Sequence, residues 1–93
     1  MGTKDYRYEH KLPLDEANRR THAELTELAK KYGLKLLVEG EQAFRLEGAG
    51  VDADVKLSAT DLTIRLSLGF LIEKALRSRI EKTLDERMAG MLA

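Results

Sequence analysis

The chain has 93 residues, and a chain of this size buries roughly 60 to 70% of its unfolded surface, so we expect a single domain over residues 1–93. It has no cysteine, which excludes disulfides, Cys-bound metals and thiol nucleophiles. The 16 basic and 16 acidic residues balance and only 5% of residues are aromatic, so we expect no nucleic-acid partner.

The N-terminal segment predicts a half-buried strand. Residues 1–5 are expected to be disordered because nothing in their pattern ties down the chain end. From Tyr6 to Leu12 the pattern alternates, with Tyr6, Tyr8, His10 and Leu12 on one face and charged residues on the other. This alternation places His10 on the core side of the strand or at its rim.

A helix is predicted next. Pro13 suits a first turn, where its missing N–H costs nothing, and Asp15 and Glu16 place negative charge at the positive end of the helix dipole. Gly33 is expected to end the helix in a left-handed conformation. The apolar stripe consists of Leu14, Ala17, Thr21, Leu25, Leu28 and Tyr32.

Four strands should follow as an antiparallel meander. Residues 34–39 and 42–47 flank Gly40-Glu41, a pair that is compatible with a type II′ hairpin turn. Residues 51–57 and 62–68 alternate between apolar and polar side chains, so each strand should have one dry and one wet face.

The last third of the chain switches from strand to helix at Gly69. Every second residue is apolar from 62 to 68, and from Phe70 onward the apolar residues recur at helical spacing. The predicted helix covers residues 70–91. Its apolar stripe is Ile72, Ala75, Leu76, Ile80, Leu84, Met88 and Met91.

The predicted element order is β-α-β-β-β-β-α, which is an α+β fold. We expect a single, mainly antiparallel five-stranded sheet with both helices covering one face. The first strand could lie parallel beside the second, as the right-handed crossover rule allows, or antiparallel beside the fifth. We favour the fifth, because this placement buries the Leu- and Ile-rich residues 62–68 inside the sheet.

The sequence offers no constellation for catalysis. His10 and His22 could share a metal with Glu9 or Asp15, but a histidine satisfied by backbone or water is favoured. The carboxylates Asp52, Asp54 and Asp61 could suggest an acidic site, but they fall on a wet face or in a turn, so a solvated surface is favoured. No G-x-S-x-G motif or phosphate-binding glycine loop is present. We therefore expect no enzyme activity, cofactor or metal, and structural roles for His10, Gly33 and Gly69.

Localisation follows from the absence of long apolar runs. None approaches the roughly 20 residues that a membrane-spanning helix needs, and the charged N-terminus lacks a signal-peptide core. We expect a cytoplasmic protein without a transmembrane segment.

A family resemblance covers most of the chain. Its closing segment contains Leu68-Gly69-Phe70-Leu71, Ile80-Glu81 and Leu84-Asp85. The upstream matches are His10, Leu12, Ala17, Lys31-Tyr32-Gly33-Leu34 and Gly50-Val51. In this order the motifs resemble those of the polyhydroxyalkanoic acid system protein family, which are small bacterial proteins associated with polyhydroxyalkanoate synthesis and granules. The resemblance implies this setting and carries over no catalytic residue.

The final helix is the predicted contact element. We expect its interaction surface to comprise Phe70, Leu71, Met88, Met91 and Leu92, because methionines suit an adaptable apolar contact. The leading hypothesis is a non-enzymatic accessory protein that binds a polyhydroxyalkanoate granule, a granule protein or itself, as a homodimer, through this helix. The alternative is a small-ligand protein in which sheet and helices enclose a pocket for an acyl or hydroxyacyl chain.

Overall fold

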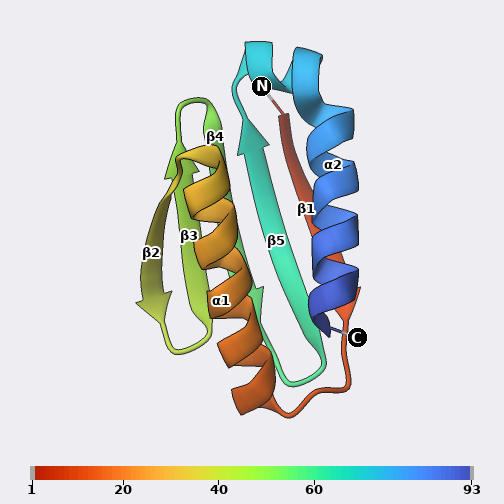
Figure 1. Cartoon of the computed structure of the whole chain (residues 1–93). Helices are drawn as coiled ribbons and strands as arrows, with labels where there is room; N and C mark the ends of the chain where they lie inside the picture. The colour runs from red at the N-terminus through yellow and green to blue at the C-terminus, as the bar shows by residue number, and fades with distance from the viewer. Residues whose placement is uncertain (1, 93) are drawn as a thin grey trace.

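The computed structural model describes residues 2–92 and confirms the α+β order β-α-β-β-β-β-α. Both helices lie on the same side of one sheet (Figure 1). α1 packs against β2 and β3, whereas α2 packs against β1 and β5. The elements are β1 (Gly2–Glu9), α1 (Leu14–Tyr32), β2 (Lys35–Gly40), β3 (Ala43–Gly48), β4 (Val51–Leu57), β5 (Asp61–Leu68) and α2 (Phe70–Leu92).

The sheet has the strand order β1-β5-β4-β3-β2, and all neighbouring strands are antiparallel. β1 pairs with β5 from Gly2 opposite Leu68 to Glu9 opposite Asp61, which confirms the favoured placement of the first strand. The expected disorder at the N-terminus is wrong for residues 2–5, because their backbone is paired with β5. Met1 lies outside the described residues.

The β2–β3 hairpin turns one residue later than predicted. Gly40 pairs with Ala43, so Glu41 and Gln42 form the turn, and the register shifts between Val38 and Gly40. A type II′ turn that starts at Gly40 would require positive φ there. The glycines with positive φ among residues 2–92 are at other positions, so the predicted turn is wrong. The bulge in β2 absorbs the difference of one residue.

Gly33 ends α1 as predicted. Its φ of 66° lies in the left-handed region, which a residue with a Cβ adopts only at a cost. The backbone N–H of Leu34 donates to the carbonyl of Ala29 at 2.8 Å, so the last turn of α1 is closed.

The core lies between the inner face of the sheet and the two helices. Alternate residues of β3, β4 and β5 point into it, as the period of two predicts. The buried residues of the sheet are Phe44, Leu46, Ala53, Val55, Leu57, Leu62, Ile64, Leu66 and Leu68, and those of α1 are Ala17, Thr21, Leu25, Leu28 and Ala29.

The outer face of the sheet is polar and ion-paired. Arg45 lies 3.8 Å from Asp52 and 3.6 Å from Asp54, and Arg65 pairs with Asp5 at 3.0 Å. These pairs confirm the wet face that was predicted for the β4 carboxylates. The open apolar groove of the molecule lies on the other, helical side.

The two helices meet at one end of the molecule and diverge toward the other (Figure 1). At the closed end, the Arg20 guanidinium donates to the carbonyl of Met91 at 3.1 Å, and Arg87 pairs with Glu24 at 2.9 Å. A cation at the last carbonyls of α2 is favourable because it faces the negative end of the helix dipole. Toward the start of α2 the two helices lie farther apart (Figure 1).

Candidate functional site

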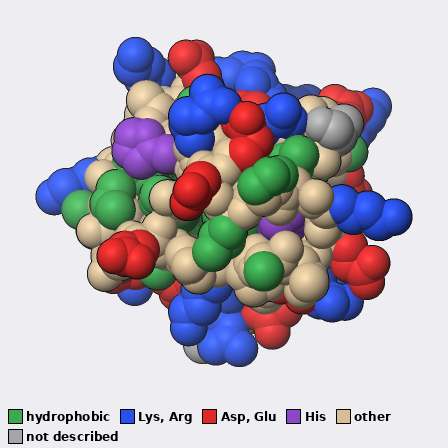
Figure 2. Space-filling view, turned by 90° about the horizontal axis from the view of Figure 1, so that it is seen from below, with side chains coloured by type: hydrophobic (Ala, Val, Ile, Leu, Met, Phe, Trp, Pro, Cys, Tyr) green, Lys and Arg blue, Asp and Glu red, His purple; other side chains and the backbone are tan. Residues whose placement is uncertain are grey.

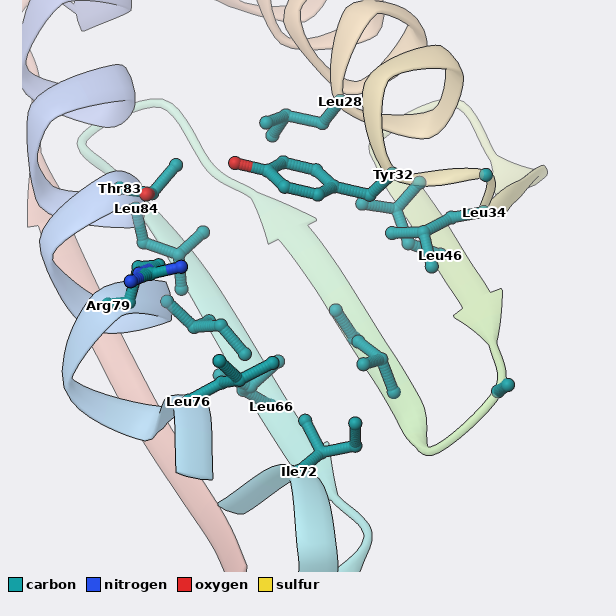
Figure 3. A pocket seen from close by; sticks show the side chains of 15 residues that line it. Leu28, Tyr32, Leu34, Leu46, Leu66, Ile72, Leu76, Arg79, Thr83 and Leu84 are labelled. Carbon is teal, nitrogen blue, oxygen red and sulfur yellow. The ribbon is translucent and has the colours of Figure 1, made fainter. Parts of the chain in front are cut away.

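The diverging helices leave an open groove with a volume of about 400 Å³ (Figure 3). Its floor is the central sheet, where Leu46, Ala53 and Leu66 are buried. One wall is the end of α1, and the other is α2 between Ile72 and Leu84. The lining residues are Leu28, Tyr32, Gly33, Leu34, Leu46, Ala49, Val51, Ala53, Leu66, Ile72, Leu76, Arg79, Ile80, Thr83 and Leu84.

The lining is apolar except at three side chains. Tyr32 and Thr83 bring hydroxyl groups from opposite walls, and Arg79 brings the single charge among the lining residues. In Figure 3 the Tyr32 ring extends from the end of α1 toward α2. An apolar groove with a few polar groups has the composition of small-molecule sites, and its volume lies within their range of about 300 to 1,000 Å³.

The start of α2 carries the most exposed apolar side chains beside this groove. Phe70 is 65% exposed and Leu71 is 76% exposed. The neighbouring Leu76 is 37% exposed and also lines the groove. The exposed start of α2 and the groove rim therefore meet at one end of the molecule.

The opposite end has a different surface. Figure 2 views the molecule from below, and basic and acidic side chains alternate there around small hydrophobic areas. This mixture of charges is typical of a solvated surface. The apolar surface of interest is thus at the open end of the helix pair.

Tyrosines of β1 hold α2 against the edge of the sheet. The Tyr8 hydroxyl donates to the Asp85 carboxylate at 2.8 Å, and the Tyr6 hydroxyl donates to Glu81. Lys4 lies 3.1 Å from the same Glu81 carboxylate. Hydrogen bonds and an ion pair therefore hold this side of α2 against β1. The apolar stripe predicted from the sequence suggested packing of apolar side chains alone.

The pKa values of Tyr6, Tyr8 and Glu81 are shifted by burial and by these bonds. Burial and the hydrogen bond to Glu81 raise the pKa of Tyr6 to about 12. The pKa of Tyr8 is also raised, first by burial and then by its bond to Asp85. The hydrogen bonds from Tyr6 and Lys4 lower the pKa of Glu81, since they favour its charged form. The neutral tyrosines and the ionised Glu81 carboxylate are thus the states that these hydrogen bonds favour.

With this geometry established, a comparison of sequences identifies the family. Residues 5–92 match the sequence model of the family described as "Putative polyhydroxyalkanoic acid system protein". The chain belongs to this family. The match spans nearly the whole chain, which confirms the resemblance seen in the motifs. No curated protein matches the sequence.

Two of the residue pairs that carry the resemblance acquire distinct structural roles. In Ile80-Glu81 and Leu84-Asp85, the apolar member lines the groove and the acidic member bonds a β1 tyrosine. The pairs are four residues apart, so one helical turn repeats the same division of faces. They therefore fix both the position of α2 and the character of the groove.

The structure divides the predicted contact residues into two groups. Phe70 and Leu71 are exposed, as a contact surface requires. Met88 is 0% and Met91 is 7% exposed, so both side chains are buried in this structure. They are covered because the end of α2 packs on the start of α1. Leu92 is half-buried beside them. Whether any of these residues contacts a partner stays a prediction.

His10 is a buried structural residue. Its Nδ1 accepts the backbone N–H of Leu12, so Nε2 carries the proton and donates to the carbonyl of Ser58 at 2.9 Å. The backbone N–H of His10 also donates to the carbonyl of Thr60 at 2.9 Å, so His10 ties the end of β1 to the turn between β4 and β5. His22 is exposed and lies edge-on to Phe44. The purple histidine atoms in Figure 2 accordingly form two separate patches.

Gly69 allows α2 to begin close to the β3–β4 turn. Its N–H donates to the carbonyl of Gly50 at 2.8 Å, and a Cβ at Gly69 would lie 3.4 Å from the Gly50 Cα. A Cβ at Gly50 would in turn lie 2.8 Å from Ile72. Both glycines thus permit the close approach that brings Ile72 into the groove.

The sequence suggested a pocket between sheet and helices only as the alternative hypothesis, and it did not place Arg79 in the lining of that pocket. A signal for this position was present, because Arg79 falls between the apolar residues Leu76 and Ile80 of the predicted stripe. Within residues 2–92, no cluster of three or more histidines, cysteines or carboxylates could hold a metal ion. Nor does either helix of that range have the length and apolar character to span a membrane.

Proposed function

We propose that this protein is a non-enzymatic accessory protein of the polyhydroxyalkanoate system that binds the granule surface through the start of α2. The observation that supports this proposal is the exposure of Phe70 and Leu71, at 65% and 76%, beside the open apolar groove. Adjacent apolar side chains that face water favour contact with an apolar surface. The family description supplies the setting, because the polyester is the bulk apolar material of that system.

The expected attachment is reversible. Full burial of a Phe or Leu side chain contributes about 1.5–3 kcal/mol, so two such residues yield a few kcal/mol at most. Leu76 and the groove rim can add to the buried area when the molecule lies on its open end. A contact of this size suits a protein that associates with and leaves a granule surface.

A non-enzymatic role agrees with how the reactive side chains are used. Both ring nitrogens of His10 are hydrogen-bonded to the backbone. The hydroxyl of Ser58 lies 2.6 Å from the Asp61 carboxylate, which also pairs with Arg7. These groups stabilise the β4–β5 turn, and their arrangement supports a structural assignment for them.

Co-sedimentation with protein-free polyhydroxyalkanoate particles tests the proposal. The variant combines Phe70→Ser with Leu71→Ser, and the matched control is Val38→Ser, which removes a 59% exposed apolar side chain from β2. We expect the wild type and the control to pellet with the particles and the double variant to stay in the supernatant. Equal pelleting of all three proteins, or a wild type that remains in solution, would overturn the proposal.

A further inference from the structure

We infer that the groove between α1 and α2 binds one acyl chain with a carboxylate head, and that Arg79 holds the head. The family description names no ligand, so this site goes beyond it. The inference also stands apart from the proposed granule contact, because neither Phe70 nor Leu71 lines the groove. Either one can therefore fail in experiment without the other.

The walls of the groove suit a single apolar chain. Leu28 and Leu66 are 5% and 3% exposed, so the deep surface is formed by side chains that the core already holds in place. The volume of about 400 Å³ is near the low end of small-molecule sites, which favours one chain over a bulkier ligand. Filling the groove with hydrocarbon removes this apolar surface from water, and that removal drives binding.

The charge of the groove selects an anionic head. Arg79 is the one charged lining residue, and no carboxylate lines the groove. The structure gives Arg79 no ion pair within residues 2–92, whereas Arg77 on the same helix lies 3.4 Å from Glu73 and 3.5 Å from Glu81. A guanidinium that keeps its donors can take a carboxylate in a bidentate pair.

Further polar groups at the opening match the same head. The hydroxyls of Tyr32 and Thr83 come from opposite walls and can donate to a carboxylate or carbonyl oxygen. Lys31 lies 5.6 Å from the centre of the Tyr32 ring and adds a second positive charge near the end of α1. An anionic amphiphile therefore fits better than a neutral or cationic one of equal length.

Calorimetric titration of the full chain with three ten-carbon probes, each below its micelle concentration, tests the charge selection. The probes are decanoate, decanol and decyltrimethylammonium. We expect decanoate to bind saturably at one site and about tenfold or more tighter than the other two, as a charge-assisted pair provides. Absence of saturable decanoate binding would overturn the site, and equal affinity for all three probes would overturn the assignment of the head.

Substitutions on α2 then locate the head. Arg79→Gln should weaken decanoate binding about tenfold and leave decanol binding unchanged. Lys82→Gln is the matched control, because it removes one exposed positive charge from the same helix outside the groove lining, and it should bind decanoate like the wild type. Arg79→Gln with wild-type decanoate affinity would contradict the proposal.

Substitutions that fill the groove locate the tail. Thr83→Phe narrows it from the α2 wall and Ala49→Phe from the β3–β4 turn, so each should abolish decanoate binding, and the second keeps the test valid if the first does not fold. A folded filling variant should still sediment with polyester particles, whereas the Phe70→Ser, Leu71→Ser variant should still bind decanoate. Full decanoate binding by a folded filling variant would place the ligand elsewhere and overturn the inference.

Discussion

Replacing Met88 by alanine tests whether the end of α2 belongs to the core. Met88 is 0% exposed, so truncation leaves a cavity between α2 and the rest of the core. Truncating a buried Leu, Ile or Met to Ala costs about 2–5 kcal/mol, because the lost transfer free energy adds to the cost of the cavity. A domain has a total stability of about 5–15 kcal/mol, so this loss is a large fraction. The melting temperature should fall by about 8 °C or more.

Urea unfolding followed by circular dichroism measures this loss. The control is Leu71→Ala on the same helix, where the side chain is 76% exposed and the change should stay within about 0.5 kcal/mol. An unfolding midpoint for Met88→Ala equal to that of the wild type, with an unchanged slope, would refute the packing of α2 on α1.

Other predictions concern pH, the tyrosine bonds and the glycines. The pKa of Glu81 is lowered in the folded state, so its charged form stabilises the fold at pH values above the ordinary carboxyl pKa of 4.5, and this contribution is lost as the pH falls through the lowered pKa. The free energy of unfolding of Glu81→Gln should therefore depend less on pH in the acid range than that of the wild type, as urea unfolding at several pH values would measure. Tyr8→Phe should lower the free energy of unfolding by about 0.5–1.5 kcal/mol through loss of the Asp85 bond, and a wild-type value would show that the bond contributes nothing. Gly33→Ala should destabilise the fold by about 1 kcal/mol, because Gly33 has a φ of 66°. Gly90→Ala should stabilise the fold by a similar amount, because Gly90 lies inside α2 and no atom lies within 4 Å of the new Cβ. A higher melting temperature for Gly33→Ala than for Gly90→Ala would contradict both predictions.

Local patterns were sufficient for most of the fold. Alternation over residues 51–57 and 62–68 and helical spacing in the two helices predicted the elements, since these periods follow from backbone geometry. The position of β1 followed from the need to bury a Leu- and Ile-rich strand. The start of β1 could not be predicted, because residues 2–5 carry no apolar alternation and their order comes from backbone pairing with β5.

The groove depends on the angle between the helices, which no local pattern encodes. The stripe of α2 predicted burial along its whole length, but only Met88 and Met91 are buried, and Leu76 is exposed. The tyrosines of β1 draw the middle of α2 toward the sheet edge through Glu81 and Asp85, so part of the stripe is left facing the groove. The position of α2 thus depends on hydrogen bonds between segments that are distant in the sequence, and the apolar pattern does not contain this information.

The most direct measurement of the proposed function places a fluorophore at the contact itself. The chain has no tryptophan, so Phe70→Trp introduces a single reporter at a 65% exposed position, and Val38→Trp supplies a matched reporter on β2. On addition of polyhydroxyalkanoate particles, the emission of Phe70→Trp should shift to shorter wavelength while that of Val38→Trp stays unchanged. If the emission of Phe70→Trp stays at the wavelength of a water-exposed tryptophan after particles are added, the attachment of α2 to the granule surface is contradicted, whether or not the protein binds the particles.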